Sequence, residues 1–371
     1  VETIGGGCFY YCTALNDVKL PANIKSLGND SGYGFFQNCT SLESITLPKK
    51  ITTLGDAVFR DCVKLKSIKL PDGITAIPNY AFYNCDSLEK VEVSKEVTHI
   101  GGHAFAECEI LAEAILPEKL ETAGDYVFYN SPNITSVTIP ASLKNIPAAM
   151  FRNMKNLTEV IIPKGVTSIG NEAFFECTAI EKIVLPDTVT EIGSSVFRNC
   201  TALKSINIPS GVTVINSYTF RNCSSLKSIE IPDSVTTIGD WAFTDCTSLE
   251  TFDMPDSVVT LGGSIFHNCT ALKSVKLSEN ITSLPSAYVH WYGYYGTFDN
   301  CSSLTDIVIP ESVTTLGIDT FAYCTKLKNI KIPKSVTSMG AGTFYECTSL
   351  VEIEIPESVS VIEYQTFENC T

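Results

Sequence analysis

Fifteen cysteines give this chain its first candidate chemistry, because thiolates close disulfides and bind zinc. Fourteen of them form one series from Cys12 to Cys370, in which most neighbours are 23 residues apart and Ser131 and Met154 fill the two vacant places. Repeats stacked at that period would hold the side chains parallel and about 5 Å apart, too far for the Cβ separation of a disulfide. We therefore expect buried thiols that act as small hydrophobic side chains.

The remaining thiol and the histidines offer little further chemistry. Cys8 lies outside the series, four residues before Cys12, so a Cys8–Cys12 disulfide is an alternative for this pair. With no CxxC pair and only 4 histidines in the chain, we expect no metal site, and we place His99 and His103 at the surface or in packing contacts. No Ser-His-Asp order, glycine-rich phosphate loop or nucleophile elbow occurs, so we expect neither an enzyme nor a cofactor.

Aromatic residues crowd one short stretch near 285–297. It contains Tyr288, His290, Trp291, Tyr292, Tyr294 and Tyr295. Rigid rings with a polar tip dominate protein interfaces and stack on sugar rings, so we predict a partner-binding loop. The alternative is that the rings fold back onto their own domain and cover a local gap. A shorter insertion near 29–35, which carries Tyr33, is a weaker candidate for the same role.

The phenylalanines define the repeat unit to which these residues belong. A Phe lies three residues before each place of the cysteine series, at sixteen positions from Phe9 to Phe367. The two insertions, of four and nine residues, lie before Phe36 and Phe298 in their repeats. A regular unit carries, at its apolar and punctuating positions, Leu226, Ile229, Ile231, Pro232, Val235, Ile238, Gly239, Ala242, Phe243 and Cys246.

The spacing within the unit predicts three short pieces. Ile229 and Ile231 alternate with polar residues, which is typical of a strand with one buried face, and Pro232 ends that strand because proline cannot donate to a ladder. Residues 235–238 form a second β-prone piece. Residues 240–245 indicate one short helical turn on the far side. Asn or Asp before most cysteine places suits a left-handed residue at the end of that turn.

One such unit is too small to bury its apolar face, so the units must stack, with strands about 4.8 Å apart. We therefore expect a single domain over 1–371, with insertions near 29–35 and 285–297. The chain opens in mid-repeat and stops at Cys370-Thr371 without a polar capping unit, so we expect a leader and other segments to lie outside it. Open ends of a solenoid favour weak self-association.

The recurring unit resembles the BspA-like class of leucine-rich repeats, and the resemblance covers essentially the whole chain. It departs from the commoner leucine-rich unit in lacking the buried Asn after the strand, where Pro232, Asp233 and Ser234 stand. The resemblance implies an α/β fold: a curved right-handed solenoid of about 15–16 repeats of 23 residues, with a parallel β-sheet on the concave face and short helical turns elsewhere. It also implies a surface or secreted protein of bacteria or protists, associated with adhesion, that shares no catalytic residues.

The outward positions of the expected concave sheet offer a second candidate site. Down the stack, the position of Glu230 is charged towards both ends and apolar or uncharged in the middle, at Ile115, Thr138, Ile161 and Val184. Apolar residues aligned on an open sheet mark contact sites. The alternative is the ordinary filling of strands by β-branched residues.

The net charge and the hydropathy of the chain limit the classes of partner that it can bind. A net charge of −15 disfavours nucleic acid and anionic membrane, and no apolar run is long enough to enter a bilayer. We expect an extracellular or cell-surface module for recognition or adhesion, with a host, matrix or other surface protein as partner. One alternative is a carbohydrate-binding module that uses the Tyr288–Tyr295 loop, and another is a structural spacer or self-assembling surface protein.

Overall fold

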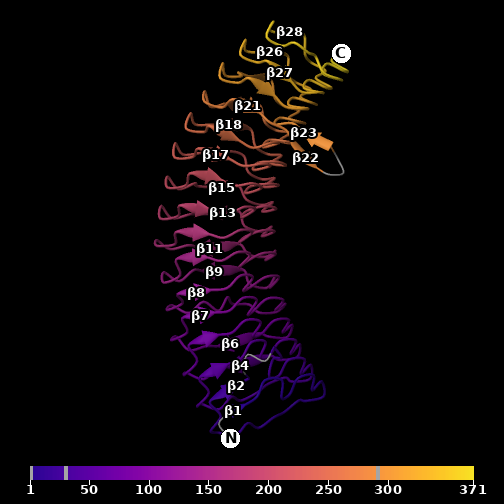
Figure 1. The fold of residues 1–371 in the computed structure, drawn as a ribbon. Helices are drawn as coiled ribbons and strands as arrows, with labels where there is room; N and C mark the ends of the chain where they lie inside the picture. The colour runs from indigo at the N-terminus through magenta and orange to yellow at the C-terminus, as the bar shows by residue number, and fades with distance from the viewer. Residues whose placement is uncertain (1–2, 29–31, 290–292) are drawn as a thin grey trace. The chain divides into compact units, whose positions relative to one another are not determined.

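The computed structural model describes residues 3–28, 32–289 and 293–371. The chain divides into two compact units, residues 1–180 and residues 181–371. Within each unit the chain winds as a parallel-strand solenoid, and successive turns are offset by the 23 residues of the repeat except at the insertions (Figure 1). No helix among the described residues is long and apolar enough to cross a membrane.

Most regular turns contribute to two rows of very short strands. The first row contains, in the first unit, β4 (Ser67–Lys69), β6 (Lys90–Glu92), β9 (Ser136–Thr138) and β11 (Glu159–Ile161). In the second unit it contains β13 (Lys182–Ile183), β15 (Ser205–Ile206), β18 (Thr251–Asp253), β20 (Ser274–Lys276), β24 (Asp306–Ile307), β26 (Asn329–Lys331) and β28 (Glu352–Glu354). Proline follows most of these strands and keeps them short.

The strands of the second row end just before the Gly or Pro of the unit, a place that Asn216 fills in one turn. In the first unit it contains β1 (Thr3–Ile4), β2 (Ser26–Leu27), β3 (Thr53–Leu54), β5 (Ala76–Ile77), β7 (His99–Ile100), β8 (Thr122–Ala123), β10 (Asn145–Ile146) and β12 (Ser168–Ile169). In the second unit it contains β14 (Glu191–Ile192), β16 (Val214–Ile215), β17 (Thr237–Ile238), β19 (Thr260–Leu261), β21 (Ser283–Leu284), β25 (Thr315–Leu316) and β27 (Ser338–Met339).

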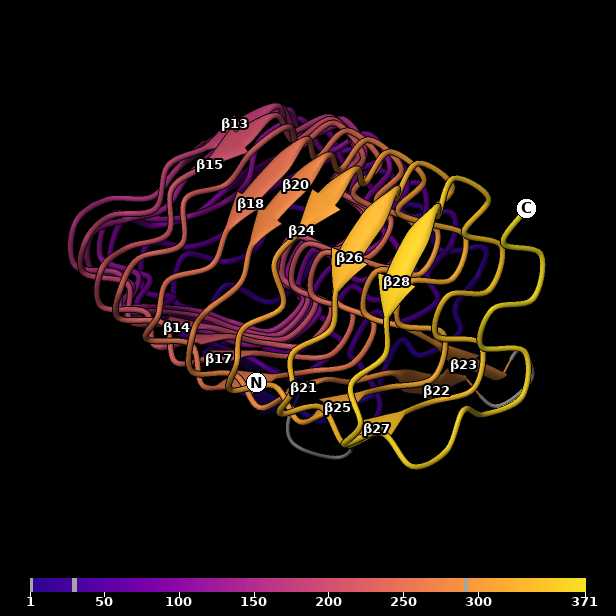
Figure 2. The same ribbon diagram turned by 90° about the horizontal axis from the view of Figure 1, so that it is seen from above.

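The two rows lie on different sides of each turn. In the second unit, seen along the stack, β18, β20, β24, β26 and β28 follow one side while β21, β25 and β27 follow another (Figure 2). The predicted alternation of burial is present even where the ladder is interrupted: Ile229 and Ile231 are buried although residues 228–231 form no strand. The predicted phenylalanines from Phe36 to Phe344 are fully buried, and neighbouring rings stack, as in the 5.4 Å step from Phe36 to Phe59, whereas Phe9 and Phe367 are half-buried.

The expected helical turns are wrong, because no helix occurs in the described parts of the chain. Residues 240–245 instead form what we call the arch, the segment between the second strand row and the cysteine place. Trp241 and Asp245 have left-handed φ values of 59° and 62°, which a right-handed helix excludes. The amides of Trp241, Phe243 and Asp245 donate to carbonyls of the next turn, at 3.0, 3.0 and 2.9 Å, rather than to residues four positions back.

The arch ends as the sequence predicts. Asn or Asp occupies the left-handed position before most cysteine places, and the side-chain amides connect successive turns, as from Asn84 to Asp61 at 2.9 Å. The thiols behind them are buried from Cys39 to Cys347, and they donate to a phenylalanine carbonyl of the preceding turn, as from Cys62 to Phe36 at 3.2 Å. At Ser131 the hydroxyl makes the equivalent bond, at 2.8 Å. Cys8 and Cys12 are both free, so the disulfide considered for them is not formed.

Candidate recognition surface

The arch segments and the two insertions contain residue types that are absent from the rest of the chain. All 15 tyrosines, both tryptophans and all four arginines, Arg60, Arg152, Arg198 and Arg221, lie in arch segments or in the two insertions that enlarge them. No lysine lies there. This segregation is visible in the sequence once each residue is assigned a place within the repeat. The apolar positions and the insertions, on which the sequence-based predictions depend, do not reveal it.

In the first unit the aromatic side chains of the arch form a ladder along the stack. The His103 ring stacks on Tyr80 and Tyr126, with centroids 4.7 and 4.8 Å apart. The Arg60 guanidinium lies over Tyr80 and Tyr83, at 5.3 and 5.0 Å from the ring centroids. Since burial lowers the pKa of His103, this imidazole is neutral at physiological pH and stacks as an aromatic ring.

Most of this ladder is engaged internally. Arg60 pairs with Asp61 at 3.3 Å, and Arg152 pairs with Glu172 while it lies over Phe175. In the second unit Arg221 likewise lies over Trp241 and pairs with Asp245, at 3.4 Å. Stacked rings have their faces covered, and a paired guanidinium has its charge neutralised. The ladder therefore connects successive turns and leaves mainly ring edges and hydroxyls to solvent.

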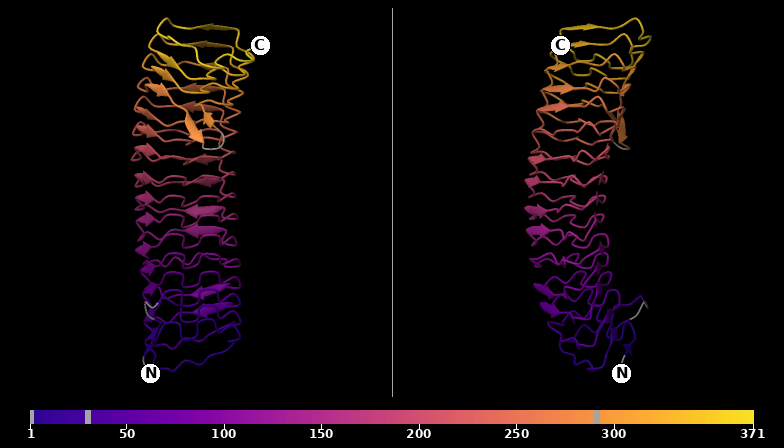
Figure 3. Two further views of the ribbon diagram at one scale, coloured as in Figure 1. Left: turned by 45° about the vertical axis from the view of Figure 1, so that its right-hand side comes forward. Right: turned by 90° about the vertical axis from the view of Figure 1, so that its left-hand side faces the viewer.

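The nine-residue insertion forms an antiparallel hairpin of β22 (Ala287–Val289) and β23 (Gly293–Tyr295), which stands off the turns of the second unit (Figure 3). Tyr288 and Tyr294 are directly opposite each other, with ring centroids 5.0 Å apart. They are 59% and 46% exposed. Because side chains alternate along a strand, Tyr295 lies on the other face, and its ring packs on His267 and Trp241 at 4.4 and 5.7 Å.

The rings of this insertion therefore take both of the orientations considered for them, in different residues. Tyr295 folds back and leaves Trp241 only 5% exposed, whereas Tyr288 and Tyr294 face outward. The predicted binding residues His290, Trp291 and Tyr292 lie outside the described residues.

The base of the hairpin is held by specific hydrogen bonds. The Ser264 hydroxyl donates to the Tyr295 carbonyl at 2.6 Å and accepts from the Ala287 amide at 3.1 Å. At Gly296 a Cβ would overlap the carbonyl of Asp319 in the next turn, so only glycine lets the chain rejoin the arch here. The shorter insertion rejoins in the same way at Gly34, whose Cβ would overlap the carbonyl of Ala57.

Titratable groups gather beneath the hairpin. The buried Asp299 lies 3.1 Å from Nδ1 of His267, the ring on which Tyr295 packs. Burial, together with the charge of Asp299, raises the pKa of Asp319 to about 6. No group of three or more His, Cys, Asp or Glu side chains suited to a metal ion is found in the described part of the chain.

The other predicted site, on the first strand row, is less continuous than expected. Thr138 and Ile161 lie side by side in β9 and β11, both exposed, with Ile161 at 49%. Ile115 is only half-buried and belongs to a turn without a first-row strand. Val184 is 56% exposed and follows β13 in the second unit. The structure pairs Thr138 with Ile161 and gives Ile115 no place in the ladder.

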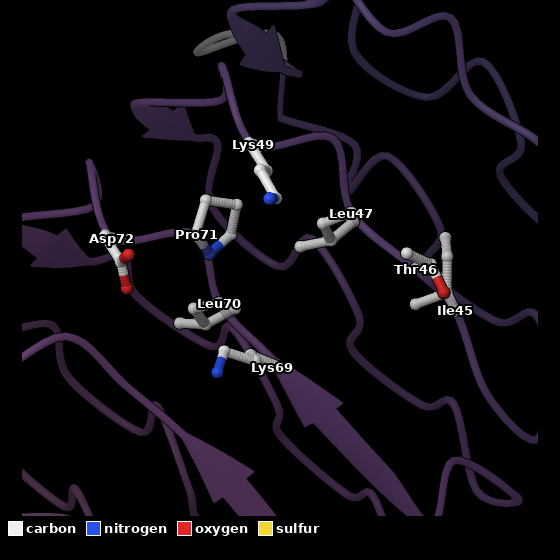
Figure 4. A pocket seen from close by; sticks show the side chains of 8 residues that line it. All are labelled: Ile45, Thr46, Leu47, Lys49, Lys69, Leu70, Pro71 and Asp72. Carbon is white, nitrogen blue, oxygen red and sulfur yellow. The ribbon is translucent and has the colours of Figure 1, made fainter.

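A hollow of about 450 Å³ opens at the first strand row of the first unit, where the ladder is reduced to an isolated bridge between Ser44 and Ser67. One wall comes from residues 45–49 and the other from residues 69–72 (Figure 4). Lys69, which lines this hollow, forms an ion pair with Glu92 at 3.4 Å. Its mixed lining shows no convergent set of polar groups, so we assign it no chemistry.

Comparison with known proteins agrees with this architecture. The family model of the BspA type leucine rich repeat region matches residues 1–92, 75–204, 190–289 and 294–371. A leucine-rich repeat protein from Bacteroides ovatus is 30% identical, with a TM-score of 0.78 over 86% of this chain and 80% of its own. No curated protein matches the chain.

Two further solved structures are similar. A leucine rich cell surface protein from Faecalibacterium prausnitzii is 31% identical, with a TM-score of 0.53 over 82% of this chain and 83% of its own. A leucine-rich repeat protein from Eubacterium ventriosum, 24% identical with a TM-score of 0.52 over 82% and 83%, shares the fold. With its family model matched along nearly the whole sequence, the chain belongs to the BspA-type leucine-rich repeat proteins.

Proposed function

We propose that this chain is a recognition module of a bacterial cell surface, which binds a partner protein through the hairpin β22–β23. The observation that carries the proposal is the outward tyrosine pair Tyr288–Tyr294, held on a hairpin whose inner face is anchored by Tyr295. A rigid base and exposed tyrosines are what a binding loop needs, because little side-chain freedom is lost on binding.

The composition of the insertion supports a protein partner. Between Pro285 and Thr297 the chain carries Tyr, Ser, Gly and Trp, and no Lys, Arg, Asp or Glu. This is the composition of antibody binding loops, in which tyrosine supplies contact area and small polar residues supply adaptable hydrogen bonds. An uncharged loop on a chain of net charge −15 suits a surface recognised by shape and apolar contact rather than by charge.

Surface location is part of the same proposal. It is supported by the family and by the similar protein from Faecalibacterium prausnitzii, whose name describes a cell surface protein. Large, specific binding surfaces are the usual use of stacked repeats.

The test is binding of the wild-type chain to arrays of purified extracellular and surface proteins and of glycans. Tyr288→Ser with Tyr294→Ser should weaken binding to an array protein by about ten- to a hundredfold, the range for losing interface tyrosines. Tyr364→Ser, at a tyrosine that is 76% exposed in the same unit, is the matched control and should change little. Unchanged binding by the double variant would contradict the hairpin proposal.

Two other array results point to the alternative functions. Binding only to glycans, lost in the double variant, would favour a carbohydrate-binding module. No ligand on either array, together with concentration-dependent oligomers, would favour a structural spacer.

A further inference from the structure

A free sheet edge lies beside the outward tyrosines of the hairpin. Among the described residues, β22 and β23 form a sheet of these two strands only, so β23 pairs with β22 alone. The outer edge of β23 therefore has no strand beside it. Such an edge is a template for another extended backbone, which can add to it as a further strand.

Ser264 shows which backbone groups of β23 face that edge. Its hydroxyl donates to the Tyr295 carbonyl at 2.6 Å and accepts from the Ala287 amide at 3.1 Å. One hydroxyl can reach both groups only because they face each other across the hairpin, as in a hydrogen-bonded pair of an antiparallel ladder. Backbone groups alternate in direction along such a strand, so the next residue, Tyr294, points its N–H and C=O away from β22.

Two further contacts agree with this alternation. The Thr297 hydroxyl donates to the Pro285 carbonyl at 2.7 Å, so the pair two residues nearer the base of the hairpin again faces inward. Tyr288 and Tyr294, with ring centroids 5.0 Å apart, show the closer side-chain approach of a pair without hydrogen bonds between its residues. No hydrogen bond joins the N–H or C=O of Tyr294 to any other described residue.

The surroundings of this edge suit an incoming backbone. Native proteins usually protect a free edge with lysine, proline or another charged side chain. Residues 286–297 contain no lysine, arginine, carboxylate or proline. A Cβ placed on Gly293 would meet nothing within 4 Å, so the space beside Tyr294 is open, and glycine in a strand lets another backbone approach closely.

We infer that the protein recognised by the hairpin adds an extended, uncharged segment to β23 as a third strand, which pairs with the N–H and C=O of Tyr294. This binding mode rests on the function proposed above and specifies the partner, because the contact is made by a linear segment rather than by a folded surface. Since side chains alternate along a strand, every second side chain of the segment packs on the face of Tyr288 and Tyr294.

The first test uses an array protein that the wild-type chain binds, together with short, end-capped, overlapping peptides that cover its sequence. One of these peptides should compete with the intact protein for the wild-type chain, because strand addition needs only a linear segment. If no peptide competes, the partner is recognised as a folded surface and the inference is overturned.

The second test separates the backbone of Tyr294 from its ring. Tyr294→Pro and Tyr294→Ser both remove the ring, but only proline also removes the N–H at the edge, which the hairpin itself does not use. Tyr294→Pro should bind the array protein at least about fivefold more weakly than Tyr294→Ser, because a carbonyl of the partner is then left unpaired. Slow hydrogen exchange of the Ala287 amide in both variants would show that the hairpin stays closed. Equal binding by the two variants would overturn the inference.

These outcomes separate strand addition from the proposed function. If Tyr288→Ser with Tyr294→Ser loses binding, while proline and serine at position 294 act alike and no peptide competes, only strand addition fails. If that double variant binds as the wild type does, or no array protein binds, both fail. Sedimentation of the wild-type chain alone tests another occupant. A concentration-dependent dimer that Tyr294→Pro abolishes and Tyr294→Ser retains would assign the edge to a second copy and overturn the inference.

Discussion

The arch and the first strand row belong to the same turns, yet they carry different surface chemistry. The arch and its insertions hold every tyrosine and arginine, whereas the 22 lysines all lie elsewhere. Exposed places of the first row are filled by residues such as Ser136, Glu159 and Lys276. Tyrosine, tryptophan and arginine are enriched at protein interfaces, while lysine, glutamate and serine are depleted. This difference in composition favours our proposal that recognition uses the arch and its hairpin rather than the first row.

The thiols at the end of the arch provide the largest expected effect. Burial raises the pKa of Cys39 to about 11 and that of Cys108 and Cys347 to about 12. A shift of three units lowers the thiolate fraction about a thousandfold, so a thiol probe at pH 8 should label the exposed Cys8 and leave the buried thiols from Cys39 to Cys347 unlabelled until unfolding.

The free energy of unfolding should also depend on the ionisation of these thiols at high pH. Above about pH 9 the unfolded thiols ionise while the folded ones stay protonated, so the free energy of unfolding should fall as pH rises further. Rapid labelling of ladder thiols in the native protein would show that the arch is loosely packed.

The next effect concerns the core behind the arch. Phe243 stacks between Phe220 and Phe266 and touches Phe252. Phe243→Ala should lower the free energy of unfolding by about 3–5 kcal/mol, measured by denaturant titration. At the exposed Glu230, which stands in the same turn at the position of the first row, substitution by Ala should change this free energy by less than about 0.5 kcal/mol. Similar values for the two variants would contradict the difference between the two faces.

A smaller effect is expected beneath the hairpin. The pKa of Asp319 is raised to about 6, so the folded state binds this proton more tightly than the unfolded state. The free energy of unfolding should rise as pH falls from about 7.5 towards 5, by about 1 kcal/mol because the carboxyl is only half-buried.

Asp319→Asn should stabilise the protein at pH 7.5 and reduce the pH dependence of the free energy of unfolding, because it removes the half-buried charge. Asparagine also tolerates the left-handed φ of 53° at this position. Melting curves at several pH values provide the measurement. A variant with the pH dependence of the wild type would assign the effect to other groups.

The smallest effect is expected on the first row. Ile161→Glu, at an exposed place of β11, should leave both the fold and the binding of an array protein within twofold of the wild type. Loss of binding with an unchanged melting temperature would instead support a binding site on the first row. The sequence pattern predicts such a site at Ile115, Thr138, Ile161 and Val184.

The stacked architecture could be predicted because a phenylalanine marks each of the sixteen repeats, and the cysteine series has the same period, with Ser131 and Met154 in its two vacant places. Alternation at Ile229 and Ile231 predicted the buried face. The arch was mispredicted as helical, since six residues with an apolar pair suit a helical turn as well as a bend. Hydrogen bonds between turns, such as that from Phe243 to Ile265, decide between them and leave no mark within one repeat.

The hairpin was predictable as an insertion but not in its orientation. Only the cross-strand register of Tyr288 with Tyr294 separates the outward pair from the inward Tyr295. The ladder of the arch depends on contacts between residues 23 positions apart, such as Tyr80 with His103, which pattern analysis within a single unit does not compare.

Because tyrosines lie only on the arch and lysines only outside it, two selective reagents can report on the two faces separately. Tyrosine nitration and lysine acetylation would be mapped by mass spectrometry on the wild-type chain, alone and with a protein that it binds on the array. Recognition by the arch predicts protection of Tyr288 and Tyr294 with lysine labelling unchanged. Protection of first-row lysines such as Lys276 and Lys331, with both tyrosines still nitrated, would contradict it.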